Sequence, residues 1–355
     1  MTIKAIGYAA QSSDDTLKPF HFERRDPCAD DVVIDILYCG ICHSDIHTAR
    51  NEWHMSNYPV VPGHEIIGRV AVVGSNVSKF KEGDLVGVGC LVDSCRHCGS
   101  CDEGLEQYCE GGLIGTYNGP DKIGGTPNAF TFGGYSNKIT VDQHFVLTIP
   151  DNLDPAAAAP LLCAGITTYS PLKHWNVGPG QKVGVIGLGG LGHMGVKLAH
   201  AMGAKVVMIT TSPEKGEDAK KLGADSVLLS TDISAMEAAQ NSFDFLLNTI
   251  PVGHDVDPYM ALLKRDATMV VVGAVEPLKN VNAALFIFRR RNMAGSLIGG
   301  LPETQEMLDF CGKHNITCEI EKISIEDINR AYERTIKGDV KYRFVIDMAT
   351  LKAIS

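Results

Sequence analysis

The feature that most restricts the fold is a glycine-rich turn that joins a strand pattern to a helix pattern. Residues 182–186 form a β-branched run typical of a buried strand, residues 193–203 have a helical pattern, and residues 205–209 are again strand-like. The turn reads Gly-x-Gly-x-x-Gly and consists of Gly187, Leu188, Gly189, Gly190, Leu191 and Gly192. Such glycines let a pyrophosphate approach the backbone at the helix N-terminus. The pattern predicts a Rossmann dinucleotide-binding unit, the alternative being a tight turn that binds nothing.

Strand-like and helical patterns continue to alternate after this turn. Apolar runs at residues 226–229, 243–248 and 267–273 are separated by helical stretches, which is typical of a doubly wound parallel sheet. We therefore expect an α/β domain at residues 153–296. The remaining residues, 297–355, are expected to return to the first domain.

The first part of the chain, residues 1–152, has a different pattern. Short β-branched runs such as residues 32–37 and 67–74 are bounded by turn residues, and no long helical pattern is present. This predicts a compact, partly open β-barrel with polar loops. Residues 118–134 are rich in Gly, Pro, Asn and Asp, which predicts a flexible surface loop.

Two short stretches of the first domain contain residues typical of a catalytic zinc site. Such a site needs about three nitrogen or sulfur ligands and an open position. Cys42 and His64 are the candidate ligands here, and Cys163 is the third; it follows a helical pattern that Pro160 interrupts. Taken alone, Cys42 could be a structural cysteine near surface histidines, and an isolated Cys163 is more often plain core.

Three polar residues immediately follow Cys42 in the sequence and suit a supporting role. Ser44 and His47 are expected to form a proton route from the reacting oxygen. Asp45 is expected to orient His64, because ligating imidazoles usually donate their second N–H to a carboxylate.

Four closely spaced cysteines indicate a second metal site. Cys95, Cys98, Cys101 and Cys109 have the spacing of a tetrahedral zinc site closed by four thiolates. A closed site leaves no position for substrate, so its role is structural. The alternatives are disulfides or an iron–sulfur cluster. We thus expect two zinc ions per chain.

The end of the second predicted Rossmann strand bears on the choice between NAD and NADP. NAD-binding units usually have an acidic residue about twenty residues after the glycines, which holds the ribose hydroxyls. This chain instead has Thr210, Thr211 and Ser212, followed by Glu214 and Lys215. Hydroxyl donors and a cation suit a 2′-phosphate, which predicts NADP(H). The alternative is an ordinary helix start with Ser212 as its cap and Lys215 in solvent.

Composition narrows the classes of function. The net charge of −10 argues against nucleic acid as a partner. No apolar run is long enough to span a membrane, and the N-terminus lacks the apolar core of a signal peptide. We therefore expect a cytoplasmic protein. Its eleven cysteines are then unlikely to form disulfides.

Together, these motifs resemble the zinc-dependent medium-chain alcohol dehydrogenases, and within them the cinnamyl alcohol dehydrogenase group with its NADP-dependent aldehyde reductases. The resemblance covers nearly the whole chain, and the segments at residues 62–65 and 162–165 are specific to it. It implies a GroES-like first domain, a Rossmann domain inserted into it, a catalytic zinc in the cleft between them, and a homodimer paired through residues 293–298.

The resemblance also assigns further residues. It implies that Glu65 is a mobile fourth zinc ligand and that Trp53 and Met55 lie in the substrate pocket. Plant members usually have a tryptophan where this chain has Gly115, so the pocket wall is expected to differ. The residues implied to line the cofactor site are Thr167, Thr249, Gly273, Ser296, Leu297 and Ile298.

The expected activity is reversible, NADPH-dependent reduction of aliphatic or aromatic aldehydes to primary alcohols, catalysed with zinc. One alternative is a reductase of conjugated C=C or iminium bonds, for which Ser44 and His47 would be dispensable. Another is a non-catalytic NADPH-binding or redox-sensing protein. Five cysteines outside the two metal sets are available for such a role: Cys28, Cys39, Cys90, Cys311 and Cys318.

Overall fold

The computed structural model describes residues 2–122, 129–273, 276–279 and 281–351. By their contacts, the residues separate into two compact units. The first unit comprises Met1–Cys163 and Gly299–Ser355, and the second comprises Ala164–Ile298. The domain boundaries expected from the sequence, after residues 152 and 296, stay a prediction.

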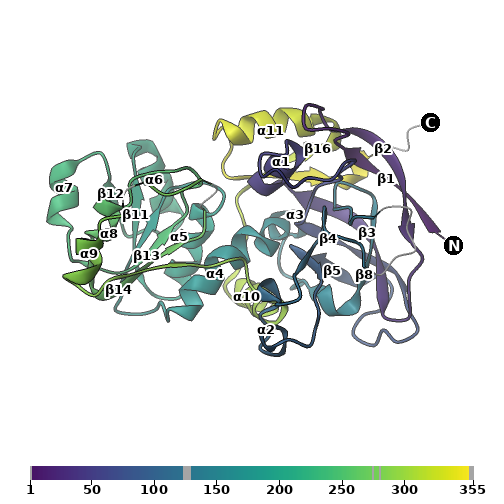
Figure 1. Ribbon diagram of the computed structural model, residues 1–355, viewed down its shortest axis with the longest axis horizontal. Coiled ribbons are helices and arrows are strands. Elements are labelled where there is room, and N and C mark those ends of the chain that lie inside the picture. The colour runs from purple at the N-terminus through teal and green to yellow at the C-terminus, as the bar shows by residue number, and fades with distance from the viewer. Residues whose placement is uncertain (1, 123–128, 274–275, 280, 352–355) are drawn as a thin grey trace. The chain divides into compact units, whose positions relative to one another are not determined.

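The second unit contains a six-stranded, fully parallel sheet (Figure 1). Its strand order is β12-β11-β10-β13-β14-β15. The chain first adds strands on one side of β10 and then, from β13 onward, on the other side, as in doubly wound dinucleotide-binding folds. The strands are β10 (Lys182–Ile186), β11 (Lys205–Thr210), β12 (Ser226–Leu229), β13 (Phe243–Asn248), β14 (Leu263–Val271) and β15 (Asn292–Gly295). This confirms the predicted Rossmann architecture.

Helices connect these strands and share a core with them. Apolar strand residues such as Ile209, Phe243 and Leu246 are almost fully buried. Because both faces of a parallel sheet are covered, the buried parts of its strands are continuous apolar runs rather than alternating ones. The helices of the second unit are α4 (Ala164–His174), α5 (Gly192–Ala201), α6 (Pro213–Lys221), α7 (Ile233–Ala238), α8 (Asp257–Met260) and α9 (Ala283–Ile287).

The first unit is built on a seven-stranded sheet in the order β16-β17-β3-β4-β5-β9, with β8 also paired to β3. The two ends of this order do not pair, so the strands form an open path and not a closed barrel. The strands are β3 (Asp31–Gly40), β4 (Ile66–Val73), β5 (Leu85–Val88), β8 (Lys138–Asp142), β9 (Leu147–Thr148), β16 (Ile320–Ser324) and β17 (Arg343–Asp347). The remaining strands form two small sheets: β1 (Thr2–Ala9) with β2 (Lys18–Arg25), and β6 (Leu91–Asp93) with β7 (Ile114–Gly115).

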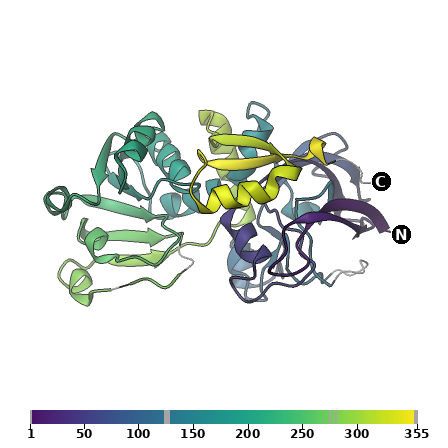
Figure 2. The same cartoon turned by 90° about the horizontal axis from the view of Figure 1, so that it is seen from above.

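The C-terminal segment contributes β16 and β17 to this sheet. β17 pairs antiparallel with the end of β3, where Ile346 lies opposite Cys39. α11 (Ile328–Ile336) lies beside β16 and β17 and contacts α1 (His43–Ala49) (Figure 2). The other helices of the unit are α2 (Gly99–Asp102), η1 (Glu106–Tyr108), η2 (Gln143–Phe145), α3 (Pro155–Ala158), η3 (Ala159–Leu162), α10 (Leu301–His314), η4 (Ile325–Asp327) and η5 (Met348–Thr350).

The helical pattern that Pro160 interrupts forms a broken series of helices. Asp154 caps α3 by accepting a hydrogen bond from the backbone N–H of Ala157 at 2.9 Å, and Pro155 occupies the first turn. The chain then tightens into the 3₁₀ helix η3, which contains Pro160, before α4 begins at Ala164. Cys163 lies at this break with φ −128° and ψ −66°. Its side chain is therefore placed by an irregular joint between two helices.

One loop prediction is wrong for part of its length. Gly133 and Gly134 were expected in a flexible surface loop, but both are buried. A Cβ atom at Gly133 would lie 2.4 Å from the carbonyl oxygen of Gly63, closer than real contacts allow. Here glycine is needed because two backbone segments pack closely. Glycine is equally favoured in exposed turns, so the composition of this stretch does not distinguish the two cases. Residues 123–128 of the same stretch lie outside the described residues.

Among the described residues, no helix is both long and apolar enough to cross a membrane.

Candidate active site

Four side chains of the first unit converge on one buried point. One ligand-type atom each from Cys42, His64, Glu65 and Cys163 lies within 4.8 Å of the others. Cys42 is the residue before α1, His64 and Glu65 immediately precede β4, and the two sulfur atoms are 3.9 Å apart. Two thiols, an imidazole and a carboxylate are the donor types that zinc prefers. The residues present therefore fit the predicted catalytic zinc, for which they are the proposed ligands.

The charges around this cluster favour a thiolate. Its hydrogen bond with Cys163, together with His64 and Arg343, holds the pKa of the Cys42 thiol well below its ordinary value. The same contact raises the pKa of Cys163, because one proton is shared between the two sulfurs. A thiolate is the form that binds metal.

Glu65, the fourth side chain of the cluster, is paired with the buried guanidinium of Arg343. One of its carboxylate oxygens, Oε1, accepts a hydrogen bond from Nη2 of Arg343, and both side chains are almost fully buried. Oε2 has no partner among the described residues. Burial raises the pKa of Glu65 to about 7, and Arg343 opposes that shift. Glu65 contributes a carboxylate oxygen to the cluster, and its Oε2 is not engaged by another described residue, which suits a fourth ligand that can be exchanged.

Asp45 supports the imidazole. Its Oδ1 atom lies 3.1 Å from Nδ1 of His64, and its side chain is completely buried. Burial alone lowers the pKa of His64, but Asp45 and the neighbouring thiols outweigh it and raise that pKa well above its ordinary value. A carboxylate on Nδ1 leaves Nε2 as the nitrogen available to a metal.

The two residues of the expected proton route lie on one side of α1. Ser44 and His47 are three positions apart, a spacing that puts side chains on the same helix face. The Cys42 thiol lies 3.7 Å from the Ser44 hydroxyl oxygen. Nδ1 of His47 contacts a carboxylate oxygen of Glu52, a partner that the sequence did not predict.

The second cysteine set forms a separate cluster. Cys95, Cys98, Cys101 and Cys109 bring their sulfur atoms within 4.8 Å of one another. Backbone N–H groups of Cys95 and Glu110 donate to the sulfurs of Cys109 and Cys98 at 3.3 and 3.4 Å. Backbone donation from His97 lowers the pKa of Cys95, to about 6. Four thiols with N–H donors fit a closed, structural zinc.

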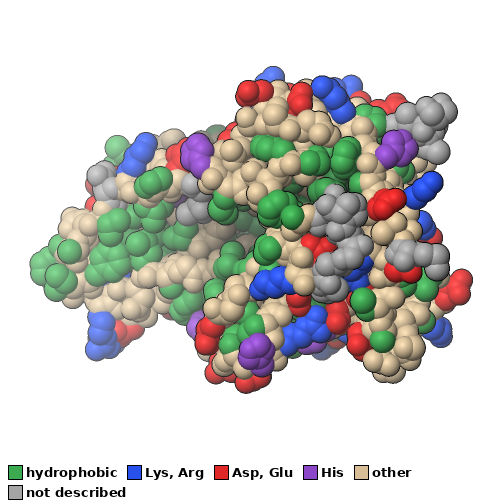
Figure 3. Space-filling model, turned by 45° about the vertical axis from the view of Figure 1, so that its right-hand side comes forward, with side chains coloured by type: hydrophobic (Ala, Val, Ile, Leu, Met, Phe, Trp, Pro, Cys, Tyr) green, Lys and Arg blue, Asp and Glu red, His purple; other side chains and the backbone are tan. Residues whose placement is uncertain are grey.

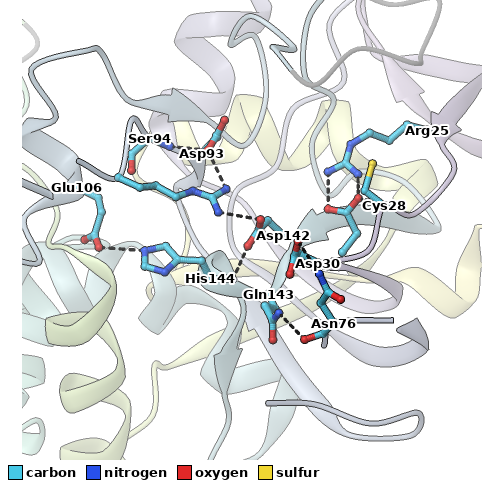
Figure 4. Close-up of polar contacts among 12 residues, drawn as sticks. Arg25, Cys28, Asp30, Asn76, Asp93, Ser94, Glu106, Asp142, Gln143 and His144 are labelled. Carbon is cyan, nitrogen blue, oxygen red and sulfur yellow. Dashed lines mark hydrogen bonds and ion pairs between the residues drawn. The ribbon is translucent and has the colours of Figure 1, made fainter. Parts of the chain in front are cut away.

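Polar contacts attach this cysteine loop to the rest of the unit (Figure 4). Arg96 bridges Asp93 and Asp142 at 3.0 and 2.8 Å. Glu106 is buried; its Oε1 pairs with His144 at 3.3 Å, and its Oε2 accepts from the backbone N–H of Leu301 at 2.9 Å. The loop therefore caps the N-terminus of α10, which begins the C-terminal part of the unit.

In the second unit, the glycine-rich turn has the expected form. Gly187 follows β10 with φ +90°, a conformation that favours glycine. A Cβ atom at Gly192 would lie 1.9 Å from the Gly187 carbonyl oxygen, whereas one at Gly189 would meet nothing within 4 Å. The Thr249 hydroxyl donates to the carbonyl oxygens of Ile186 and Gly187 at 2.8 and 3.1 Å. The residue that follows β13, Thr249, thus fixes the first part of the turn by hydrogen bonds, and the space beside Gly189 is unfilled.

The end of β11 contains both features that the sequence left open. Ser212 caps α6 and accepts from the backbone N–H of Lys215 at 3.3 Å, as in an ordinary helix start. Thr211 and the side chain of Lys215 are nevertheless exposed. Capping uses only the Ser212 oxygen as an acceptor, so its O–H can still donate to a phosphate.

Comparisons with known proteins agree with this geometry. Residues 28–151 match the alcohol dehydrogenase GroES-like domain, and residues 190–313 match the zinc-binding dehydrogenase family. The aldehyde reductase YahK of Escherichia coli is 56% identical over 99% of both chains. The chain belongs to the zinc-dependent medium-chain alcohol dehydrogenase family.

Solved structures of this family have the same fold over the whole chain. A cinnamyl alcohol dehydrogenase from Sorghum bicolor superposes with a TM-score of 0.95 at 46% identity and covers 99% of both chains. A cinnamyl alcohol dehydrogenase of Helicobacter pylori, complexed with NADP(H), has a TM-score of 0.92 at 44% identity, with both chains covered completely.

The residues that the family resemblance assigned are distributed over both units. In the first unit, the ring of Trp53 lies 5.2 Å from that of His47, Met55 is 66% exposed, and Gly115 lies in β7. In the second unit, Thr167 is buried in α4 and Ile298 has φ +36°. Gly273 approaches the Thr249 carbonyl oxygen so closely that a Cβ would lie 2.5 Å away. Ser296 and Leu297 follow β15, and Leu297 is exposed.

We predict two separable zinc ions per chain. Cys163→Ser should remove one zinc and abolish turnover without unfolding the protein. Cys98→Ser should remove the other and lower the melting temperature, since a zinc closed by four cysteines contributes folding free energy. Metal analysis and thermal melting test this, with the exposed Cys28→Ser as the control that keeps both ions. A fully active wild type with one zinc per chain contradicts the two-site assignment.

Proposed function

We propose that this protein is an NADP-dependent alcohol dehydrogenase that reversibly reduces aliphatic or aromatic aldehydes to primary alcohols. The observation that carries the proposal is the convergence of Cys42, His64 and Cys163 at a buried point with Ser44 beside it. Three nitrogen or sulfur ligands with a hydroxyl nearby are what a catalytic zinc with an exchangeable position requires. The names of relatives, an aldehyde reductase and a cinnamyl alcohol dehydrogenase complexed with NADP(H), support the same activity.

In this proposal the bound zinc supplies Lewis-acid polarisation of the substrate oxygen, and NADPH supplies hydride. The chain provides the ligands, the proton and the orientation. Ser44 donates a proton to the oxygen that becomes the alcohol, and His47 replaces that proton. Glu52 holds the imidazole of His47 through Nδ1, so that Nε2 is the nitrogen that can face the relay.

Cofactor choice is proposed to depend on the end of β11. The hydroxyls of Thr210, Thr211 and Ser212 and the ammonium of Lys215 suit a 2′-phosphate, and none of the four residues carries a carboxylate that would repel it. Glu214 lies in the first turn of α6 with its side chain exposed, so solvent screens its charge.

The activity and its proton relay can be tested together. Wild-type enzyme should oxidise NADPH with benzaldehyde, and with cinnamaldehyde it should yield cinnamyl alcohol. His47→Ala should lower kcat/KM by about 10²–10⁴-fold, the range of general acid–base catalysis, and Ser44→Ala by at least as much. The exposed His21→Ala serves as control.

Two results would contradict this proposal. Reduction of the C=C bond of cinnamaldehyde would indicate the alternative reductase, and no turnover with any aldehyde would favour a non-catalytic protein. An unchanged rate and pH profile in His47→Ala would remove the relay while leaving the reaction in place.

The cofactor assignment makes a sharper prediction. Lys215→Ala should weaken NADPH about tenfold or more and leave NADH nearly unchanged, because a hydrogen bond to a charged group contributes about 1.5–3 kcal/mol. Thr211→Asp should shift preference further towards NADH, since its carboxylate repels the phosphate and accepts from a free ribose hydroxyl. Measured kcat/KM values with both cofactors decide it. Lys221→Ala, an exposed lysine of the same helix, is the matched control; a wild type that prefers NADH would overturn the assignment.

We further propose a homodimer paired through the edge strand β15 and residues 293–298. Within the described residues, β15 pairs on one side, with β14, and unpaired strand edges recruit other chains. Apolar side chains are exposed on the second unit (Figure 3). Ile287 and Phe288 are among the exposed apolar residues of this unit. Sedimentation at micromolar concentration should give a dimer that Phe288→Asp weakens; a wild-type monomer rules it out.

A cytoplasmic location is also proposed. All eleven cysteines are described and none is joined in a disulfide, and two four-residue sets that include six of them are arranged as metal ligands. Reducing compartments preserve this state.

A further inference from the structure

The carboxylate of Asp45 is surrounded by hydrogen-bond donors from three parts of the chain. Oδ2 accepts from the backbone N–H of Cys42 at 2.8 Å and from the Tyr135 hydroxyl at 2.9 Å. Oδ1 accepts from the backbone N–H of Gly63 at 3.1 Å and lies 3.1 Å from Nδ1 of His64. Each oxygen thus has two partners, which fully uses its acceptor capacity. Among the described residues, the donors to Asp45 are two backbone N–H groups, the proposed ligand His64 and the Tyr135 hydroxyl. Tyr135 is therefore the side-chain donor that is not itself a proposed ligand.

The segment that holds Tyr135 is built against the segment that holds His64. The backbone N–H groups of Gly133, Gly134 and Tyr135 donate to the carbonyl oxygens of Val61, Gly63 and Pro62 at 2.7, 2.8 and 3.0 Å. A Cβ atom at Gly63 would lie 2.7 Å from Cδ1 of the Tyr135 ring. The two backbones therefore approach as closely as glycine allows.

Arg24 fixes the other side of the Tyr135 segment. Its buried guanidinium donates to the carbonyl oxygens of Phe132, Gly133 and Lys138 and to the hydroxyl of Ser136. A buried guanidinium whose N–H groups donate to all of these oxygens resists movement, because any shift leaves the buried charge without hydrogen-bond partners. Tyr135 is consequently held between a fixed arginine and the ligand segment.

We propose that Tyr135 is a positioning residue for the catalytic metal: its hydroxyl fixes Asp45, and Asp45 fixes the ring of His64. This rests on the proposed zinc site. Losing the hydroxyl leaves one acceptor position of a buried carboxylate without a partner and lets Asp45 and the imidazole turn. Removing a group that bonds a ligand directly, as Asp45 does, typically changes metal affinity or activity about 10–100-fold. Tyr135 acts through Asp45, so we expect its loss to give an effect at the lower end of that range.

A second tyrosine provides a matched control. Tyr332 of α11 is buried beside Tyr135, with ring centroids 6.4 Å apart. The tyrosine hydroxyl that donates a hydrogen bond to Asp45 is that of Tyr135. Tyr332→Phe therefore removes a buried hydroxyl from the same cluster while leaving the Asp45 contact in place.

The test follows zinc retention in the holoenzyme. Wild type, Tyr135→Phe, Tyr332→Phe and His64→Ala are equilibrated with graded dipicolinate, and zinc per chain is measured after desalting. His64→Ala defines the release curve of the four-cysteine zinc alone, so the other zinc can be followed separately. For Tyr135→Phe we expect half of that other zinc to be released at a chelator concentration about tenfold below the one that wild type needs. We also expect a lower kcat when the zinc is present. Tyr332→Phe should follow wild type within about twofold.

The outcomes separate positioning from packing. A release curve of Tyr135→Phe that coincides with wild type, or an equal shift in Tyr332→Phe, overturns the proposal even if melting temperatures fall. If His64→Ala keeps both zinc ions, the zinc assignment itself fails, and the role of Tyr135 with it. Should Tyr135→Phe not fold, Arg24→Lys loosens the same segment from its far side. It should shift release of the same zinc in the same direction, and no shift contradicts the proposal.

Discussion

A buried carboxylate is costly unless donors surround it, and the first unit is arranged around one such group. Asp45 is completely enclosed and is bonded by Cys42, Gly63 and Tyr135, with His64 alongside. These contacts join the start of α1, the turn before β4 and the glycine-rich segment that precedes β8. The charge thereby fixes, relative to one another, the segments that supply Cys42 and His64. Removing any one donor would leave the others to hold a charge that water cannot reach.

The two cysteine-containing clusters differ in how they are completed. The set at residues 95–109 comes from a single loop, with four thiols and no other ligand type. The set around Cys42 draws on three distant segments and mixes sulfur, nitrogen and oxygen. A local, uniform set can fold with its metal as one piece. A set drawn from distant segments forms only when the surrounding domain has folded. Such a domain can hold three ligands in place while the fourth position exchanges, as a catalytic zinc site requires.

The sequence predicted what is encoded locally. The glycine turn, the four-cysteine spacing and the βα alternation each lie within a short window, where spacing and geometry determine each other. Arg343 could not be found in this way, because it is 278 positions from Glu65 and looks like an ordinary basic residue at the start of a strand. Tyr135 gave no signal either. Gly133 and Gly134 gave a misleading one, since a close backbone approach and an exposed turn favour the same residue.

The distance along the chain between Glu65 and Arg343 has a consequence for synthesis on the ribosome. Glu65 is made early, whereas its counter-charge arrives only with β17, after the whole of the second unit has been translated. The second unit is continuous and can fold as soon as it emerges. The first unit must wait with an unneutralised carboxylate and an unfinished sheet edge. The ion pair between Glu65 and Arg343 can therefore form only after the second unit has been synthesised.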